Sequence, residues 1–440
     1  AFIFFVFLII SIVYSVQLLH LGSLKKNFKE TENRTFINKK NYRADIIDRN
    51  RNYLVKTVSS IDIGINPIEV IDQKKLLINL QLIFPNKNYV EIKKKLKKRK
   101  FFYFEKKISA EKYEKIMLLG DKSIKSEEKL TRIYPQKNLF SHIIGQIDDN
   151  NKGISGIEKF FDKKLKSIKE PLKLTVDTDI QFLIREELKK FHSIFQSKGG
   201  AVILMNVNSG EIISMVSYPD FDLNERATID NLDYINRATK GVYELGSVFK
   251  TFTVAAGLDE GLIEPETKFL NLEKKLDCGK NKITEYDDKL PSNLTVEEIL
   301  IKSGNIGSVK IGQMLEIKGL KLFLEKIGVL KRIDFDIEEV GEPIPFRWGK
   351  CKLATVSFGH GITTTPLQIA KGYAIISNGG LEIQPTLIKK KLNDNKKRII
   401  KESVSKEINL ILRKIVLEGT AKLANVNGYE VGGKTGTANK

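Results

Sequence analysis

The sequence predicts an α+β protein: an N-terminal membrane helix, an α/β domain, and a larger domain in which helices cover an antiparallel sheet. Three observations support this prediction. Residues 1–19 are uncharged and nearly all apolar. Two strand-like runs, 200–205 and 211–216, flank a turn at 206–210 that ends in glycine, as in a β-hairpin. The run TFTVAAGL, which directly follows Lys250, is apolar on almost every side and predicts a helix buried inside a domain.

The composition is that of a folded and strongly basic chain. Its 440 residues allow two to three domains, and 41% hydrophobic with 29% charged residues describe a mostly water-soluble protein. A formal net charge of +20 would suit a nucleic-acid-binding protein, but the lysines are spread along the chain and no nucleic-acid-binding module is recognisable. Attraction to an anionic membrane or cell-wall polymer explains this positive charge better.

Residues 1–22 are predicted to be a transmembrane signal anchor. About 20 apolar residues span a bilayer, and the run 1–19 approaches that length. A cleaved signal peptide and a buried helix are the alternatives, and the absence of a small-x-small cleavage pattern after the run favours an uncleaved anchor. Because no initiator methionine is present, we expect the N-terminus to be incomplete, and the positive-inside rule cannot orient the span.

Residues 23–168 are predicted to form a separate domain with lysine-rich helices. The run KKKLKKRK at 93–100, followed by FFYF, could bind nucleic acid through its basic and aromatic side chains. A solvated helix followed by a buried strand is the alternative favoured for a membrane-anchored chain. We expect Arg43 or Arg49 to pair with Glu158, and His142 to have a packing or hydrogen-bonding role.

Residues 169–440 are predicted to form the larger domain. A short strand, 174–177, leads into a helix that Asp177 or Thr178 caps. We expect the hairpin next and then several helices before a final strand whose three glycines let another backbone approach. The expected elements are the first helix with apolar side Ile180, Phe182, Leu183 and Leu188, helices around Ser247, 296–315 and 366–376, and the final strand 429–437.

The candidate nucleophile is Ser247, with Lys250 as its base. Residues three apart share one face of a helix, so the hydroxyl and the amine can meet. A helix N-terminus favours an alkoxide, and burial lowers the pKa of a lysine until it can accept the serine proton. Ser-x-x-Lys occurs five times in this chain, at Ser23, Ser109, Ser126, Ser247 and Ser403, so the spacing alone is a weak signal.

Two further motifs follow Ser247 in order, Ser303-Gly304-Asn305 and Lys434-Thr435-Gly436-Thr437. Together the three motifs resemble those of penicillin-binding proteins and serine β-lactamases. The order of further segments resembles class B penicillin-binding proteins, the membrane-anchored D,D-transpeptidases that crosslink peptidoglycan, and is nearest their division-specific septal subgroup. These segments are RADIIDRNRNYL at 43–54, GIEKFFD at 156–162, NRATKGVYELGSVFK at 236–250, SGNIGSVKIG at 303–312, SFGHGITTTPLQIAKGYAIISNGG at 357–380 and VGGKTGTA at 431–438.

The resemblance implies a non-catalytic pedestal (dimerisation-type) domain at 23–168 and a transpeptidase domain at 169–440. The transpeptidase domain is expected to have the penicillin-binding/β-lactamase-like fold, an antiparallel sheet with helices on both faces. Because family members continue through further strands and a final helix, we expect this chain to be incomplete at its C-terminus. Leu245 replaces the usual proline, Val248 a small hydroxyl residue and Ala44 a glycine, and none of these departures removes a reacting group.

The resemblance also implies a role for each motif residue. Ser247 would form the acyl-enzyme with a stem peptide, Lys250 would be its base, and Ser303 would relay a proton to the leaving amine. Asn305 would hold the Lys250 amine and the substrate amide, and Lys434 would supply positive charge. The substrate-binding residues would be Thr435, Gly436 and Thr437, with the backbone N–H groups of Ser247 and Thr437 as the oxyanion hole. No metal or cofactor is implied.

The implied setting is the bacterial inner membrane, with a single span and the catalytic domain on the periplasmic, extracytoplasmic side. The implied partners are peptidoglycan stem peptides, β-lactams, a polytopic glycosyltransferase and other division proteins, with no nucleic acid. Two alternative functions stay open: a serine β-lactamase or β-lactam sensor, and a non-catalytic membrane scaffold. Cys278 and Cys351 lack metal-ligand spacing, and the sequence cannot show whether they come close enough for a disulfide.

Overall fold

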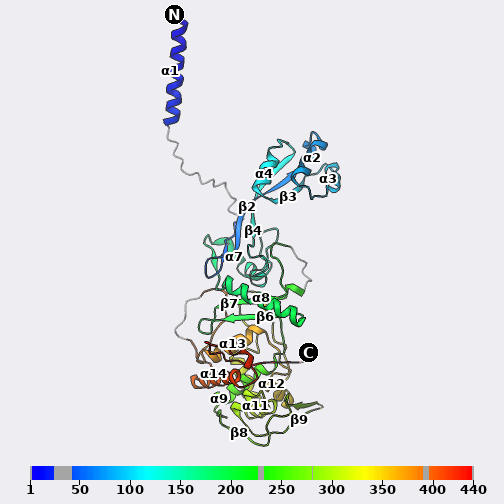
Figure 1. The fold of residues 1–440 in the computed structure, drawn as a ribbon, viewed down its shortest axis with the longest axis vertical. Helices are drawn as coiled ribbons and strands as arrows, with labels where there is room; N and C mark the ends of the chain where they lie inside the picture. The colour runs from blue at the N-terminus through cyan, green and yellow to red at the C-terminus, as the bar shows by residue number, and fades with distance from the viewer. Residues whose placement is uncertain (1, 24–41, 226–231, 280, 390–395, 439–440) are drawn as a thin grey trace. The chain divides into compact units, whose positions relative to one another are not determined.

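The computed structural model describes residues 2–23, 42–225, 232–279, 281–389 and 396–438 (Figure 1). They form a mixed α+β protein, as predicted. The chain divides into two compact units: Ala1–Tyr42 with Ser59–Leu130, and Arg43–Val58 with Thr131–Lys440. Two long strands, β2 (Tyr53–Ile65) and β4 (Ile124–Ile133), contribute residues to both units. The domain boundary predicted after residue 168 stays a prediction.

The smaller unit combines short helices with the far half of β2. Strand β3 pairs antiparallel with Ile61–Ile65 of β2. Ile92 and Leu96 of α3 are buried while the lysines between and after them are exposed, so the basic run is a solvated helix face as expected. Of the following aromatics, Phe104 is buried but Phe101 is half exposed. The elements are η2 (Pro67–Glu69), α2 (Gln73–Ile83), α3 (Tyr89–Lys97), β3 (Phe102–Ile108) and α4 (Ala110–Met117).

Helix α1 (Phe2–Ser23) covers the segment predicted to span a membrane. Its first turn carries no acidic residue, and described side chains such as Phe4, Phe7 and Ile9 are more than half exposed. In the part of the chain that the structure describes, no helix satisfies the combined length and hydropathy needed to cross a bilayer.

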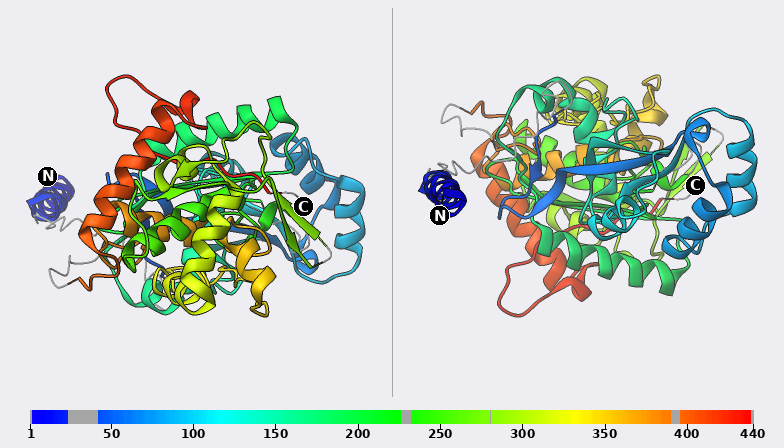
Figure 2. Two further views of the ribbon diagram at one scale, coloured as in Figure 1. Left: turned by 90° about the horizontal axis from the view of Figure 1, so that it is seen from below. Right: turned by 90° about the horizontal axis from the view of Figure 1, so that it is seen from above.

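The larger unit begins with a small pairing around β1 (Ile46–Ile47), which lies antiparallel to β2 and parallel to β5 (Leu172–Lys173). Figure 2 shows this unit from two ends, with α14 (orange to red) along one flank. Its helices are α5 (Ser141–Ile144), α6 (Gly156–Phe160), α7 (Asp162–Ser167), α8 (Thr178–Phe195), α9 (Phe249–Asp259), α10 (Val296–Ile301), α11 (Asn305–Lys326), α12 (Lys350–Ser357), α13 (Pro366–Ser377) and α14 (Glu402–Leu417). Its further strands and 3₁₀ turns are β6 (Gly200–Met205), β7 (Ile212–Tyr218), η3 (Leu232–Tyr234), η4 (Gly246–Val248), β8 (Lys268–Phe269), β9 (Lys275–Cys278), β10 (Asn281–Thr284), β11 (Leu294–Thr295) and η5 (Lys422–Ala424).

The predicted hairpin is confirmed. Strands β6 and β7 pair antiparallel from Gly200 opposite Tyr218 to Met205 opposite Ile212. Helix α8 packs against β7. Asp177 caps this helix, since its carboxylate accepts from the backbone N–H groups of Asp179 and Ile180.

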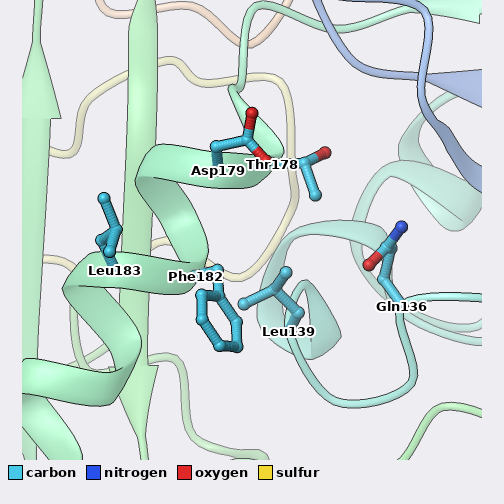
Figure 3. A pocket seen from close by; sticks show the side chains of 6 residues that line it. All are labelled: Gln136, Leu139, Thr178, Asp179, Phe182 and Leu183. Carbon is cyan, nitrogen blue, oxygen red and sulfur yellow. The ribbon is translucent and has the colours of Figure 1, made fainter.

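The predicted apolar side of α8 is wrong in part. Phe182 and Leu183 are 53% and 64% exposed, whereas Gln181 is buried. The reason is that the Gln181 amide donates to the Leu139 and Met215 carbonyls and accepts from the Ser214 hydroxyl, which turns this polar residue inward. Phe182 and Leu183 instead line an open pocket of about 430 Å³, in which Phe182 lies beside Leu139 (Figure 3).

The core of the larger unit is organised around α9. Every residue from Phe249 to Leu258 is buried, which confirms the helix predicted from the run TFTVAAGL. Helices α11, α12 and α14 pack around it. The helices predicted at 296–315 and 366–376 are also present, the first divided into α10 and α11 by the turn that holds Ser303. The motif that begins at Ser247 therefore leads directly into the centre of the domain.

The strand predicted at 429–437 is not formed among the described residues. No β-ladder involves this segment. Its first half contacts α14 instead: the Gly433 N–H donates to the Leu412 carbonyl at 3.1 Å, and the Arg413 guanidinium donates to the Val431 carbonyl at 2.8 Å. A strand requires a neighbouring backbone that bonds with it in register, and α14 cannot offer one.

A buried ion network forms around Glu158, and it confirms the predicted pairing for Arg43. Glu158 is fully buried, and its two carboxylate oxygens accept from Arg43 at 2.5 Å and Arg132 at 2.8 Å. Asp162 accepts a further bond from Arg43 at 2.6 Å. Arg49 lies instead 3.6 Å from Glu211. Sequence analysis missed Arg132 because nothing in its local sequence indicates burial.

Cys278 and Cys351 form a disulfide, with their Cα atoms 5.2 Å apart. The bond ties β9 to α12 through two cysteines that lie 73 positions apart in the sequence. The hairpin of β9 and β10 is thereby attached covalently to a helix that packs on α11.

Glu158→Gln is expected to destabilise the larger unit by about 3–5 kcal/mol, because it leaves the buried Arg43 and Arg132 without the carboxylate that both contact. Urea denaturation measures this loss. Glu402→Gln is the matched control, since it removes an exposed ion pair with Lys406 and should leave the unfolding midpoint unchanged. Equal midpoints for both variants would contradict the expectation.

Candidate active site

Ser247 lies in the 3₁₀ turn η4, directly before α9. Gly246 has a φ of 59°, and a Cβ atom there would lie 2.1 Å from the Thr437 carbonyl oxygen. A Cβ on Gly359 would in turn lie 1.9 Å from the Gly246 carbonyl oxygen. Glycine is therefore required at both positions. The turn that holds Ser247 packs backbone to backbone against Thr437. Ser247 is half-buried at the N-terminal end of a buried helix.

Lys250 is the central buried amine of the site. Its side chain is 1% exposed, and its Nζ donates to the Ser303 carbonyl oxygen and, at 3.1 Å, to the Ser303 hydroxyl. Burial and, to a smaller extent, the charge of Lys434 lower the pKa of Lys250 while the charge of Glu285 raises it, and together they bring the pKa to about 7. A substantial fraction of this amine is therefore neutral near pH 7 and able to accept a proton.

The spacing of the motif predicts a contact between Ser247 and Lys250, but in this structure Lys250 bonds to Ser303. Within the described part of the chain the Ser247 hydroxyl has no protein hydrogen-bond partner. The two residues do not share one α-helix, because Ser247 belongs to the 3₁₀ turn and Lys250 to the first turn of α9. The Ser247 hydroxyl is thus free to rotate toward either the amine or a substrate.

Ser303 connects the two lysines of the site. Its φ of 58° is unusual for a residue with a side chain, and its carbonyl accepts from Lys250. Its hydroxyl also accepts from Lys434 Nζ at 2.9 Å. One serine hydroxyl therefore lies within hydrogen-bonding distance of two amines from segments far apart in the sequence.

Lys434 comes from the extended segment that was predicted to be a strand. Its Nζ also donates to the Thr435 carbonyl at 2.8 Å. Burial lowers the pKa of Lys434 to about 8. Because two cations close together repel, we expect protons on Lys250 and Lys434 to titrate as a coupled pair.

The side chains of the remaining predicted residues have no hydrogen bond to Lys250 or Lys434 in the part of the chain that the structure describes. Asn305 Nδ2 donates to the Thr284 carbonyl at 2.7 Å, and not to Lys250. Thr435 Oγ1 lies 2.9 Å from Thr420 Oγ1. A Cβ on Gly436 would lie 2.5 Å from the Leu245 carbonyl, so this backbone lies against the serine turn. Thr435, Gly436 and Thr437 are exposed, and a ligand can reach them.

Two residues near the centre were missed by sequence analysis. The Tyr373 hydroxyl, on α13, donates to the Val248 carbonyl at 2.9 Å and lies 3.0 Å from the Thr251 hydroxyl. Glu285 accepts backbone hydrogen bonds at the start of α11. Neither residue has a local signal: the tyrosine lies in an apolar helix, and the glutamate lies in a stretch rich in charged residues.

Comparison with known proteins identifies both parts of the chain. Residues 200–440 match the penicillin-binding protein transpeptidase domain, and residues 38–192 match the penicillin-binding protein dimerisation domain. The chain belongs to the class B penicillin-binding proteins. Ser247, Lys250, Ser303 and Lys434 all lie within the matched transpeptidase domain.

Relatives of this penicillin-binding protein come from several bacteria. It is 30% identical over 409 residues to the probable peptidoglycan D,D-transpeptidase FtsI of Caulobacter vibrioides. The matched region covers 90% of this chain and 69% of the relative. It is 29% identical over 447 residues to stage V sporulation protein D of Bacillus subtilis, with the same coverage of 90% and 69%. Peptidoglycan D,D-transpeptidase FtsI of Escherichia coli K12 is 26% identical over 375 residues, covering 78% of the chain and 63% of the relative.

The two departures from the usual family motif pack against the last segment. The Leu245 carbonyl and a Val248 methyl group would lie 2.5 Å and 2.9 Å from a Cβ on Gly436. Both side chains also pack on the main core. Of these two replacements only the Val248 side chain contacts Gly436, since the Leu245 atom beside it belongs to the backbone.

We expect the rate of acylation by a penicillin to follow a narrow bell-shaped pH profile. The rate should rise through pH 7 as Lys250 loses its proton, since only the neutral amine can act as base. It should fall through pH 8 as Lys434 loses the charge that attracts the carboxylate of the ligand. Second-order labelling rates from about pH 5.5 to 9.5 measure this profile. A rising limb near the ordinary lysine pKa of about 10.4 would contradict it.

Proposed function

We propose that this penicillin-binding protein is a peptidoglycan D,D-transpeptidase that works through an acyl-enzyme on Ser247. One observation carries the proposal: Lys250 and Lys434 both contact the Ser303 hydroxyl, at 3.1 Å and 2.9 Å, beside the turn that holds Ser247. A nucleophile, a desolvated base, a proton relay and a fixed positive charge are thereby assembled from three motifs. Relatives named as peptidoglycan D,D-transpeptidases support the same assignment.

In the first half-reaction, Ser247 Oγ attacks the carbonyl between the two terminal D-alanines of a stem peptide. Its proton passes to neutral Lys250, whose pKa of about 7 suits this transfer near neutral pH. The amide C–N bond then breaks. The leaving nitrogen takes its proton through the Ser303 hydroxyl, and free D-alanine departs.

In the second half-reaction, an amine of a neighbouring stem peptide attacks the ester carbonyl on Ser247. This amine loses a proton through the same groups, and the ester C–O bond breaks to restore the Ser247 hydroxyl. The products are a new amide crosslink and the original enzyme. Since the same Lys250–Ser303 contacts serve both directions, one set of hydrogen bonds is enough for the cycle.

The substrate would lie along residues 434–437. Lys434 would provide charge beside Ser303, while the exposed Thr435 and Thr437 would bind the terminal carboxylate. The backbone N–H groups of Ser247 and Thr437 would stabilise the oxyanion, and the close packing of Gly246 on Thr437 supports their proximity. Asn305 would contact the substrate amide after exchanging its bond to Thr284.

The proposed setting is septal wall synthesis at the bacterial inner membrane, with the catalytic domain on its periplasmic, extracytoplasmic side. FtsI relatives support the division role, and the apolar run 1–19 of the sequence is the basis for proposing a single-span anchor. A polytopic glycosyltransferase and other division proteins are the proposed partners. The proposed parts of the chain are an anchor at 1–22, a pedestal at 23–168 and a transpeptidase domain at 169–440.

A fluorescent penicillin should label the full-length protein covalently, and Ser247→Ala should abolish that labelling because it removes the attacking oxygen. Ser403→Ala is the matched control: it changes an exposed serine of another Ser-x-x-Lys sequence, on α14, and should label like the wild type. Labelled protein is followed on a denaturing gel.

Two outcomes would contradict the proposal. Absence of label on folded wild-type protein would favour the scaffold function. Rapid catalytic turnover of nitrocefin, in place of stable labelling, would identify a serine β-lactamase instead.

A further inference from the structure

Glu285 is a buried acid directly after β10, outside the three motifs of the site. It is 9% exposed. Its two oxygens accept from two consecutive backbone N–H groups, those of Asn305 at 2.6 Å and Ile306 at 2.8 Å. A carboxylate that is removed from water and bonded to two main-chain donors is well ordered.

These two N–H groups belong to the first turn of α11, whose helical backbone is interrupted further along at Glu316. The first four N–H groups of a helix lack partners within it, and a side chain at the capping position normally accepts from one or two of them. Here the capping residue is Gly304, which has no side chain and makes no capping hydrogen bond. Glu285 supplies the missing acceptors from a distant segment, and its charge complements the positive end of the helix dipole.

The helix start that Glu285 holds is continuous with Ser303. A Cβ on Gly304 would lie 3.3 Å from the Leu290 side chain and 3.8 Å from Glu285 Oε1, so the turn between Ser303 and α11 packs closely on the segment around Glu285. Ser303 itself has a φ of 58°. A residue in this conformation stays in place only when its neighbours are firmly held.

The segment that carries Glu285 is itself anchored on both sides. The Thr284 carbonyl, one residue earlier, accepts from Asn305 Nδ2 at 2.7 Å, so two consecutive residues are bonded to the start of α11. Strand β10 pairs with β9, and the disulfide of Cys278 joins β9 to α12. The carboxylate is therefore presented from a braced hairpin and not from a free loop.

We propose that Glu285 is a positioning residue for acyl transfer: it fixes the start of α11, and through it the Ser303 group that holds Lys250, while placing a negative charge near Lys250. This inference rests on the proposed function. The charged groups that act on Lys250 are Lys434 and Glu285, and they act in opposite directions: Lys434 lowers the pKa of Lys250, and Glu285 raises it.

Glu285→Gln tests both effects in the full-length protein, with the second-order rate of fluorescent penicillin labelling measured as a function of pH. The amide has one acceptor oxygen and no charge, so we expect the maximum rate to fall by about ten- to a hundredfold, as a displaced catalytic group does. Because removal of the negative charge lowers the pKa of Lys250, the rising limb should move to lower pH by about half a unit. Glu285→Asp keeps the charge and should return the limb toward its wild-type position.

Glu298→Gln is the matched control. Glu298 also caps a helix, α10, by accepting from the Thr295 N–H at 2.9 Å, and glutamine can retain that bond. We expect both the rate and the rising limb of Glu298→Gln to equal those of the wild type. A thermal melt of each variant confirms that it is folded.

The outcomes separate this inference from the proposed function. Wild-type protein that takes no label contradicts the proposed function. Labelled wild type together with an unchanged profile in Glu285→Gln overturns the role of Glu285. A folded Glu285→Gln variant that is slower but has an unmoved rising limb would reduce Glu285 to a helix cap, and it would also overturn the inference.

Discussion

The contact of two lysine amines with one serine hydroxyl is the interaction on which this active site depends. Lys250 and Lys434 meet at Ser303, 3.1 Å and 2.9 Å from its oxygen. In water both amines would be protonated and would repel each other. Burial lowers both pKa values, to about 7 and about 8, so that near neutral pH one amine can act as a base while the other keeps its charge.

Burial of these lysine amines requires a large and rigid surrounding structure. Helix α9 meets the requirement because all of its residues from Phe249 to Leu258 are buried among α11, α12 and α14. Close backbone contacts complete the enclosure: Gly246 packs on Thr437, and Gly359 packs on Gly246. Glycine at 246 and 359 is therefore essential to the geometry of the proposed site, since a Cβ atom at either position would separate the segments that form it.

Buried charge recurs at the Glu158 network, where no reacting group is present. There two arginines meet two carboxylates, those of Glu158 and Asp162, so the positive and negative charges are equal in number. In the candidate site the two lysines carry charge of the same sign. Glu285 is the buried acid that opposes them, because its charge raises the pKa of Lys250 while burial and Lys434 lower it. The Glu158 network therefore has balanced charges, as a structural ion network does. The proposed active site has two lysines and one acid, and this imbalance adds to burial in lowering the pKa of Lys250.

The sequence by itself determined the α+β class, the β6–β7 hairpin, the buried helix after Ser247 and the order of the three motifs, because periodicity and short motifs are local properties. It also indicated that Arg43 or Arg49 pairs with Glu158, and the structure selects Arg43. Only the tertiary structure decided that Gln181 faces inward, that 429–437 forms no strand, that the cysteines are bonded, and that Glu285 caps α11. Each of these depends on which distant group supplies a hydrogen bond, a partner backbone or a second sulfur, and that is set by the packing of the whole domain.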